Sequence, residues 1–476
     1  MVWLLIALII FIFQIAIILL LEFRNPSKTI AWLSILFCCP VIGFVFYYFV
    51  AQDYKARKHI RTRGSRLFRQ IRPFFWSRLT AVRDIGEIHN PEFEHQERLF
   101  NLLWRLTESP ITGSNASRVL TDGKDAFDAM LKAIEAAEKH IHIEFYIFRH
   151  DVIGTRFQEI MIRKAREGVK VRFICDGLGS YKLKREFVER LKEAGVESYF
   201  FLPPLLSFID RRINYRNHRK IVVVDGARGF VGGINVGDDY LGKYPKMGYW
   251  RDTHLEIEGD AVYFLQNIFL DDWQLASGEK IVDPALFPEH SCKADEQIQI
   301  VSSGPDQEWN AIQELIFAAI SVAKKRIWIT SPYFIPDPGV YEGLKTAAVS
   351  GVDVRIIIPW KADSRLVQLA SLSYVEELLL AGVRFYQYQK GFVHAKVLIV
   401  DQLLASVGTA NMDLRSFYSN FELTALLLEQ SKIERLVDDF EKDMLVSREM
   451  TPSEFQNRPF MHKTAEILCR MLSPLL

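Results

Sequence analysis

Two long apolar runs open the chain and predict membrane-spanning helices. The first, residues 2–21, contains a single polar side chain, Gln14. A helix of this length crosses the roughly 30 Å hydrocarbon core of a bilayer. The second run, residues 30–50, carries Ser34, Pro40 and Gly43, and neighbouring helices can satisfy the backbone carbonyl that a proline leaves free. We therefore expect residues 1–50 to form a two-helix transmembrane hairpin with spans at 2–21 and 30–50.

A cleavable secretory signal is the alternative explanation for the first apolar run. Such a signal begins with a basic segment and has a shorter apolar stretch. In this chain no basic segment precedes the run, and a second apolar run follows closely. These features favour the hairpin.

The segment after the second run is strongly basic and indicates the orientation of the hairpin. Residues 54–82 contain no acidic side chain. Their basic residues are Lys55, Arg57, Lys58, Arg61, Arg63, Arg66, Arg69, Arg72 and Arg78. Positive residues stay on the cytoplasmic side of a membrane. We therefore expect a multi-pass membrane protein whose N-terminus and soluble part face the cytoplasm.

The same basic segment also suggests a partner. Basic residues beside a bilayer attract anionic lipid headgroups, so we interpret residues 51–110 as a basic juxtamembrane linker. Nucleic-acid binding is the alternative, but the net charge of the whole chain is only +1, whereas nucleic-acid binders are usually strongly basic. We expect membrane phospholipids as partners and no nucleic acid.

The pattern beyond residue 110 repeats once. Residues 141–148 and 327–334 are similar apolar runs, and each follows a stretch rich in Ala and Lys. Residues 169–175 and 352–358 are a second matching pair. Short β-branched runs that alternate with helical segments predict parallel-sheet α/β units. The fold class is therefore α/β, with two related domains at residues 111–290 and 291–476 packed as a pseudo-twofold pair.

Each repeat ends in the same composite motif, H-x-K-x4-D-x6-G-x2-N. The first copy consists of His218, Lys220, Asp225, Gly232 and Asn235, and the second of His394, Lys396, Asp401, Gly408 and Asn411. Because an apolar, β-branched run follows each lysine, the motif is expected on a buried strand. There the histidine and the lysine two residues later share one face. Two such motifs in equivalent repeats are not accidental.

The residue types of the paired motif suit a phosphodiester substrate. One histidine can attack phosphorus and form a covalent intermediate while the other protonates the leaving oxygen. The lysines, together with Asn235 and Asn411, would bind the phosphate oxygens and neutralise their charge. A nucleophilic histidine also needs a carboxylate that fixes its tautomer, and Asp252 and Glu422 stand at corresponding places downstream of the two motifs.

Three further expectations concern the motif aspartates, metals and cofactors. We count Asp225 and Asp401 within the catalytic motifs, although their place at the far ends of the strands favours a structural or network role. Zinc is an alternative for paired histidines, but the motif lysines would repel a cation and His140 and His142 stand alone. We therefore predict no metal and no cofactor.

The complete double motif resembles the signature of the phospholipase D superfamily, and the chain as a whole resembles the bacterial cardiolipin synthases. Those proteins share the N-terminal hairpin with an Arg-Asn-Pro turn (residues 24–26 in this chain), the basic linker and the two domains. Similar local runs occur at residues 146–148, 232–235, 249–252, 331–334, 391–394 and 411–416. The resemblance covers nearly the whole chain, and no motif position is missing.

The resemblance implies transfer of a phosphatidyl group from one phosphatidylglycerol to another, which gives cardiolipin and glycerol. It also implies His218 as nucleophile and His394 as acid and base, an order for which the near symmetry of the repeat gives no independent ground. A membrane-bound phospholipase D, another phosphatidyltransferase and a non-catalytic scaffold that binds anionic lipid remain alternatives. A homo-oligomer is possible.

The sequence leaves two structural interpretations open for each of two segments. Residues 202–216 mix apolar and basic side chains, so they are either a membrane-contacting segment or an ordinary loop. Near the C-terminus, Met461, Ala465, Leu468, Leu472 and Leu475 recur at helical spacing. This helix either packs on the protein body or lies in the membrane interface.

Overall fold

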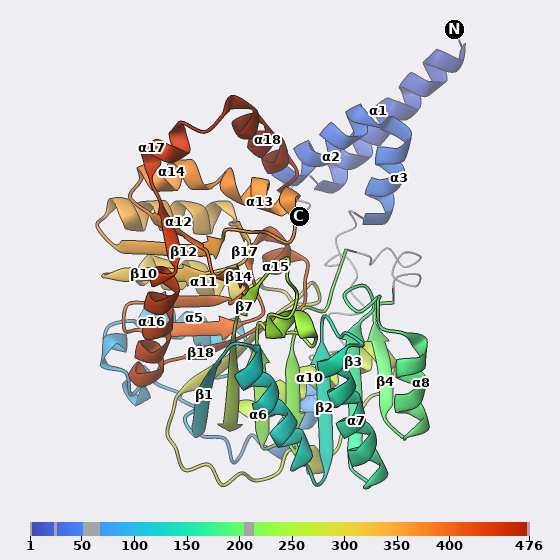
Figure 1. Ribbon diagram of the computed structural model, residues 1–476, viewed down its shortest axis with the longest axis vertical. Helices are drawn as coiled ribbons and strands as arrows, with labels where there is room; N and C mark the ends of the chain where they lie inside the picture. The colour runs from blue at the N-terminus through green and yellow to red at the C-terminus, as the bar shows by residue number, and fades with distance from the viewer. Residues whose placement is uncertain (1, 23–25, 51–66, 204–213, 474–476) are drawn as a thin grey trace.

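The computed structural model describes residues 2–22, 26–50, 67–203 and 214–473. Its first helix, α1 (Val2–Glu22), has 21 residues and is long and apolar enough to cross a membrane. The second apolar run forms two helices, α2 (Pro26–Cys38) and α3 (Pro40–Val50). Helix α2 packs against both α1 and α3, and α3 turns away from the direction of α2 (Figure 1).

The prediction of one continuous second span is wrong, and Pro40 explains the break. Proline has no amide hydrogen, and its ring clashes with the preceding helical turn. Gly43 then lets α3 fold back against α2, since a Cβ atom there would lie 2.9 Å from the carbonyl oxygen of Ile35. At 1.5 Å per residue, α2 is about 20 Å long, shorter than the bilayer core.

Most of the basic flank, from Lys55 to Arg66, lies outside the described residues, as does the predicted Arg24-Asn25 turn. From residue 67 onward the chain packs on the protein body. This segment contains the short helices η2 (Arg72–Phe74), η3 (Ile85–Glu87) and η4 (Pro91–Phe93) and the helix α5 (Glu97–Leu106). Much of it packs on the second half of the protein, where the Asn90 amide donates to the carbonyls of Leu403 (3.0 Å) and Leu428 (2.8 Å).

The first half is built on a seven-stranded sheet with the order β1-β8-β6-β5-β2-β3-β4. Its strands are β1 (Asn115–Thr121), β2 (His140–Phe145), β3 (Lys170–Asp176), β4 (Glu197–Phe201), β5 (Ile221–Val224), β6 (Arg228–Gly232) and β8 (Thr253–Gly259). The helices are α6 (Gly123–Glu135), α7 (Val152–Arg166), α8 (Arg185–Glu193) and α10 (Ala261–Ser277), with the short helix η5 (Asp238–Leu241).

The second half repeats this sheet and extends it by one strand, in the order β19-β13-β12-β10-β15-β16-β18-β9. Its strands are β9 (Ile298–Ser303), β10 (Arg326–Thr330), β12 (Asp353–Pro359), β13 (Arg384–Tyr388), β15 (Val397–Val400), β16 (Leu404–Gly408), β18 (Glu422–Leu427) and β19 (Ser447–Met450). The helices are η6 (Pro284–Leu286), α11 (Ala311–Val322), α12 (Pro338–Val349), α13 (Arg365–Leu372), α14 (Val375–Leu380), α15 (Leu414–Tyr418), α16 (Gln430–Leu445), α17 (Pro452–Gln456) and α18 (Phe460–Met471).

The two large sheets are mixed, so the expected parallel pairing holds for only part of each sheet. Among their described strands, only β2-β3-β4 and the equivalent β10-β12-β13 run parallel. The strand between the lysine and the aspartate of each motif, β5 or β15, pairs antiparallel with its neighbours and returns through a tight hairpin to β6 or β16. Periodicity alone does not distinguish a buried hairpin strand from a buried parallel strand.

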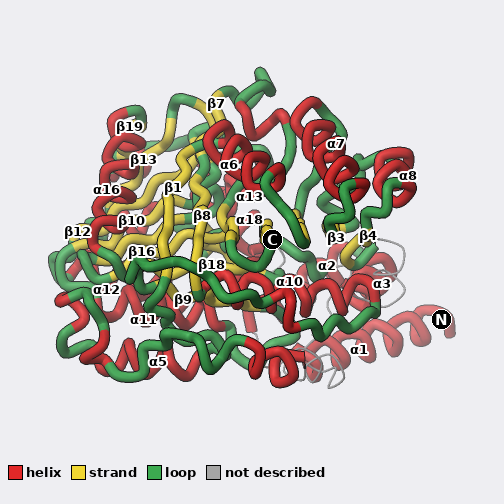
Figure 2. Tube along the Cα trace, turned by 90° about the horizontal axis from the view of Figure 1, so that it is seen from below, coloured by secondary structure: helices red, strands yellow, loops and turns green. Residues whose placement is uncertain are grey.

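The two halves form one continuous body. Figure 2 shows the strands gathered in the centre with helices around them. One hydrophobic core contains residues of both sheets and of α10, with Trp273 completely buried in it. A small two-stranded sheet also crosses between the halves, where β7 (Tyr249–Arg251) pairs in parallel with β14 (Gly391–Val393). This crossing places His394, which follows β14, next to Asp252, which follows β7.

Candidate active site

Backbone hydrogen bonds between the halves position both motif histidines. The His218 N–H donates to the Phe421 carbonyl (2.9 Å), and the His394 N–H donates to the Arg251 carbonyl (2.7 Å). His218 directly precedes the buried start of β5, and His394 follows β14 and precedes β15. Each histidine therefore lies where its own sheet meets the other half of the protein.

Each imidazole is paired with a carboxylate from the opposite half. His218 Nδ1 lies 3.0 Å from Glu422 Oε2, and His394 Nδ1 lies 2.7 Å from Asp252 Oδ2. Both carboxylates are completely buried, and both histidines are 8% exposed. A carboxylate at Nδ1 favours the tautomer with the proton on that nitrogen, which leaves Nε2 free as nucleophile or base. Sequence spacing does not reveal this exchange of partners.

The motif lysines are buried beside the histidines. Lys220 Nζ donates to the His218 carbonyl at 2.6 Å, and Lys396 Nζ donates to the His394 carbonyl at 2.5 Å. Burial lowers the pKa of Lys220 to about 7 and that of Lys396 to about 8, and the charge of Lys396 contributes to the shift at Lys220. A bound anion would favour the protonated form of both lysines.

Burial also keeps the imidazoles neutral. Burial lowers the pKa of His218 to about 4; the charges of Lys220 and Lys396 contribute to this shift, and Glu422 opposes it. Burial and the neighbouring Lys396 lower the pKa of His394 to about 3. Burial alone would raise the pKa of Glu422, but His218, Lys220 and Thr409 lower it to about 2. Two neutral bases thus contact ionised carboxylates.

The motif asparagines follow the hairpins and lie in the same region. Asn235 is 1% exposed, and its Oδ1 accepts a hydrogen bond from the Ile147 N–H (3.0 Å). Asn411 is 5% exposed, and its Oδ1 has no hydrogen-bond partner among the described residues. The Asn411 N–H donates to Ser416 Oγ at 3.1 Å. The amide of Asn411 is thus less constrained by protein contacts than that of Asn235.

The motif aspartates lie at the opposite ends of their strands. The carboxylate of Asp225 accepts backbone hydrogen bonds from residues 138–140, each 2.8 Å long. The carboxylate of Asp401 accepts the equivalent bonds from residues 324–326. Both aspartates adopt a left-handed backbone with φ of 52°. These contacts tie the turn after the motif strand to the start of the neighbouring strand.

Other residues that contact the site differ between the two repeats, so the repeated motif does not reveal them. Thr409 Oγ1 donates to Glu422 Oε2 at 2.5 Å, while the equivalent position in the first half is Gly233, where a Cβ atom would clash with Asp252 Oδ1. Tyr146 meets the His218 ring edge-on with 4.9 Å between ring centroids, and the Trp250 ring lies 5.2 Å from that of His394. These contacts fix the ring planes.

Arg219, inside the first motif, joins the halves. Its Nη1 contacts both Asp272 oxygens at 2.7 and 2.8 Å. Its Nε and Nη2 donate to the carbonyls of Glu422 (3.2 Å) and Ser303 (3.3 Å) in the other half. The second motif has Ala395 in this position. A pattern search that treats the middle residue as variable therefore misses the interaction.

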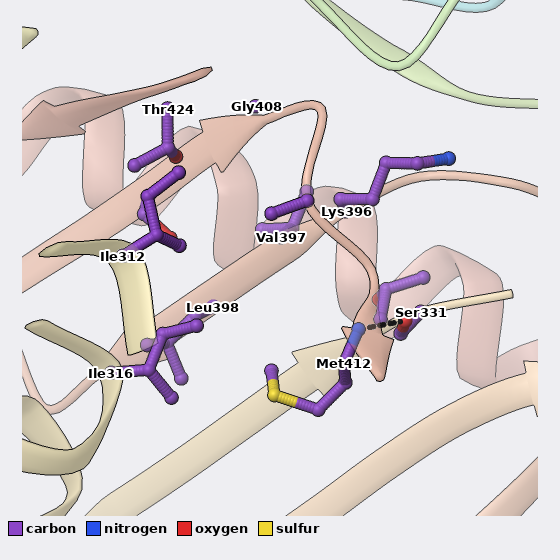
Figure 3. A pocket seen from close by; sticks show the side chains of 12 residues that line it. Ile312, Ile316, Ser331, Lys396, Val397, Leu398, Gly408, Met412 and Thr424 are labelled. Atoms are coloured by element: carbon purple, nitrogen blue, oxygen red, sulfur yellow. Dashed lines mark hydrogen bonds between the residues drawn. The ribbon is translucent and has the colours of Figure 1, made fainter. Parts of the chain in front are cut away.

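A small cavity lies beside Lys396 but is not a substrate site. Its volume is about 20 Å³, enough for about one water molecule. In Figure 3 the Lys396 nitrogen points away from the apolar lining residues Ile312, Ile316 and Leu398. The reactive lysine group is therefore directed away from this cavity.

Metal ligands do not cluster in the part of the chain that the structure describes: no group of three or more His, Cys, Asp or Glu there could hold a metal ion. The prediction that the reaction needs neither metal nor cofactor remains a prediction.

Comparison with known proteins identifies the family. The profile described as cardiolipin synthase, PLD-like domain matches residues 130–260 and 316–444, and the profile described as phospholipase D-nuclease N-terminal matches residues 2–52. The chain is 47% identical over 465 residues to a cardiolipin synthase of Alkalihalophilus pseudofirmus, covering 97% of this chain and 92% of the relative. The chain belongs to the cardiolipin synthase family.

A second curated protein and one solved structure are also similar to this chain. The chain is 41% identical over 459 residues to the major cardiolipin synthase ClsA of Bacillus subtilis, covering 96% of this chain and 95% of the relative. A phosphatidylserine synthase of Haemophilus influenzae matches the fold with a TM-score of 0.61 at 14% identity, covering 80% of this chain and all of that structure. The chain therefore shares the fold of that structure, and the matching profiles place it in the phospholipase D superfamily.

The buried ion pair of Arg219 yields a stability prediction. Arg219→Ala leaves Asp272 buried without its cation, which costs about 3–5 kcal/mol of unfolding free energy. The control Arg228→Ala removes a half-exposed pair with Glu258 and costs about 1 kcal/mol or less. Denaturant unfolding of the detergent-solubilised protein measures both. Equal losses in the two variants would contradict the assigned importance of Arg219.

The buried His254 yields a pH prediction. Burial lowers its pKa from 6.5 to about 4, so the folded state excludes a proton that the unfolded state binds below pH 6.5. Relative to a His254→Phe variant, the parent protein therefore loses stability as the pH falls from 6.5 to 4, by about 1.4 kcal/mol per pH unit at most. Unfolding of both proteins at several pH values measures this difference. Parallel pH curves would show that His254 titrates normally.

Proposed function

We propose that the chain is a cardiolipin synthase that joins two phosphatidylglycerol molecules through a phosphohistidine intermediate. The observation that carries this proposal is the reciprocal pairing of His218 with Glu422 and of His394 with Asp252 around two buried lysines. Two neutral imidazoles beside two cations suit attack on an anionic phosphodiester. Relatives named cardiolipin synthase, similar over nearly the whole chain, support the choice of lipid.

In the first step, His218 Nε2 attacks the phosphorus of one phosphatidylglycerol, and the bond from phosphorus to the glycerol oxygen breaks. His394 donates a proton to that oxygen, and glycerol leaves. The anionic phosphate favours the protonated form of His394 when it binds. Lys220, Lys396 and the amides of Asn235 and Asn411 would bind the phosphate oxygens and stabilise the charge that grows in the transition state.

In the second step, the neutral His394 removes the proton from a hydroxyl of a second phosphatidylglycerol. That oxygen attacks phosphorus, the bond to His218 breaks, and cardiolipin forms. Glu422 and Asp252 hold the imidazoles in the tautomer that exposes Nε2. Asp225 and Asp401 support the strands that carry the motifs and do not act on the substrate. Deep burial of both histidines favours a lipid hydroxyl over water as acceptor.

We also propose that the two halves form a pseudo-twofold pair at the cytoplasmic face of the bacterial membrane. The reciprocal contacts of the motifs support the twofold relation. Helix α1 is suited to span the bilayer, and the basic residues that follow α3 favour the cytoplasmic side. The pair of helices α2 and α3 would enter the bilayer beside α1.

Trapping the intermediate tests both the reaction and the roles of the histidines. A His394→Ala variant, incubated with phosphatidylglycerol labelled in the phosphatidyl group, should gain label on His218 slowly because the first step lacks its acid, and should retain that label because the second step lacks its base. The His218→Ala variant should retain none. Both variants should make cardiolipin at least about a hundredfold more slowly than the parent, the lower range for loss of a general base. Peptide mapping and lipid chromatography measure these outcomes.

Three results would contradict the proposal. Label on His394 in the His218→Ala variant would reverse the two roles. Release of phosphatidic acid without cardiolipin by the parent protein would identify a phospholipase D, and unchanged lipid binding without turnover would identify a scaffold.

A further inference from the structure

Helix α18 is amphipathic, and its apolar face points away from the protein. The outer face of α18 consists of Phe460, Met461, Ile467, Leu468 and Met471, which are 41–82% exposed. These positions follow the spacing i, i+1, i+7, i+8, i+11, which gathers them on one side of a helix. Apolar residues on one helix face normally pack on a core, so the exposure of this face requires an explanation.

The opposite face of α18 is polar and buried, but its charge is compensated. Glu466 is 2% exposed and binds Arg458 through contacts of 3.1 Å from Nε and 2.7 Å from Nη2. Cys469 packs in a small core with Ile335 of β11 (Phe334–Ile335) and Ala370 of α13. These contacts set the rotation of the helix, so its apolar side cannot turn inward without breaking the Glu466–Arg458 pair.

The position of α18 identifies what covers its outer face. Helix α18 contacts α2, and in Figure 1 it lies on the same side of the protein as α1 and α2. Two basic side chains, Lys463 and Arg470, also belong to α18, and Arg470 lies over the Tyr374 ring at 4.3 Å. An apolar face with basic side chains on the same helix is typical of helices that lie in the headgroup region of a bilayer.

We propose that the outer face of α18 lies in the interface of a bilayer that contains anionic phospholipids and forms a second membrane contact of the catalytic body. This inference rests on the proposed membrane location of α1 and extends it to the C-terminal helix. A second copy of the chain could cover this face instead. Contact between two copies, however, would not explain why α18 lies next to α2. The structure shows α18 packed on the protein body through Cys469 and α13, and the proposed membrane contact concerns its exposed outer face.

This contact would also fix the catalytic centre relative to the lipid surface. Cys469 of α18 packs against Ile335 in β11, and β11 pairs with β17 (Met412–Asp413), where Ile335 is the partner of Asp413. Asn411, which precedes β17, belongs to the second motif. The contact of Cys469 with Ile335 and the β11–β17 pair therefore connect α18 to Asn411, the residue that we propose binds the substrate phosphate.

Site-directed quenching in the full-length protein tests the proposal. Cys38, Cys39 and Cys292 are replaced by Ser, and a fluorophore is attached at Leu468→Cys in vesicles of phosphatidylglycerol and phosphatidylcholine. We expect quenching by lipids that carry a nitroxide on the acyl chain and protection from aqueous iodide. A label at Lys442→Cys on α16, whose side chain is 69% exposed, is the control and should show the reverse.

A third label, at Ile9→Cys in α1, reports separately on the membrane span. If the label at Ile9 is reached by the lipid quencher and that at Leu468 only by iodide, the inference about α18 is wrong while the proposed location of α1 stands. If protection at Leu468 depends on protein concentration at constant lipid, a second copy covers the helix, which also overturns the inference.

An activity measurement distinguishes membrane contact from structural support. The double variant Ile467→Glu/Leu468→Glu should turn over phosphatidylglycerol in vesicles about tenfold more slowly than the parent, because charge opposes insertion of the helix. With phosphatidylglycerol in detergent micelles the two proteins should have equal rates. The control Lys442→Glu should match the parent in both. Equal losses of the double variant in vesicles and micelles would show that these residues support the fold instead.

Discussion

The structure depends on one constraint: each catalytic imidazole needs a buried carboxylate, and the carboxylate comes from the other half of the chain. Glu422 contacts His218, and Asp252 contacts His394. Neither half therefore contains a complete catalytic pair. The backbone bonds from each histidine to a carbonyl of the opposite half, the β7–β14 pair and the bonds from Arg219 to the carbonyls of Glu422 and Ser303 all hold this arrangement together. The core shared by the two sheets keeps the halves in register.

Burial at this junction determines the charge state of the site. Two ammonium groups and two imidazoles cannot all be protonated in a nearly dry space, so the histidines are neutral and the pKa of each lysine falls toward neutrality. The carboxylates stay ionised because the cationic groups face them. An incoming phosphodiester supplies the negative charge that balances the lysines. The site is thus prepared for an anion before the substrate binds.

The sequence revealed the reactive residues of each motif, but it did not reveal which residues of the two halves contact each other. The two motifs, with Asn235 and Asn411, could be recognised from spacing, and the structure brings the motif histidines and lysines to the junction. The exchange of Asp252 and Glu422 between the halves could not be predicted, because strand pairing between distant segments has no local signal. Arg219 and Thr409 escaped notice for the related reason that their counterparts, Ala395 and Gly233, break the repeat.

The fold was predictable to a similar degree. Apolar periodicity indicated the two α/β halves and the helix α1. It did not reveal the antiparallel pairing of β5 and β15, since buried strands of either direction are continuously apolar. The hydropathy of residues 30–50 suggested one span, whereas the local effect of Pro40 divides the segment into α2 and α3. At the C-terminus, helical spacing predicted α18, but which face it exposes depends on the pairing of Glu466 with Arg458.

The central claim is that the histidine–carboxylate pairs cross between the halves. Nitrogen-15 NMR of the imidazoles in selectively labelled protein, assigned with single histidine variants, tests it directly. Glu422→Gln should shift the ring-nitrogen resonances of His218 and leave those of His394 nearly unchanged, and Asp252→Asn should do the reverse. If each carboxylate variant instead perturbs the histidine of its own half, the pairs do not cross and the claim is wrong.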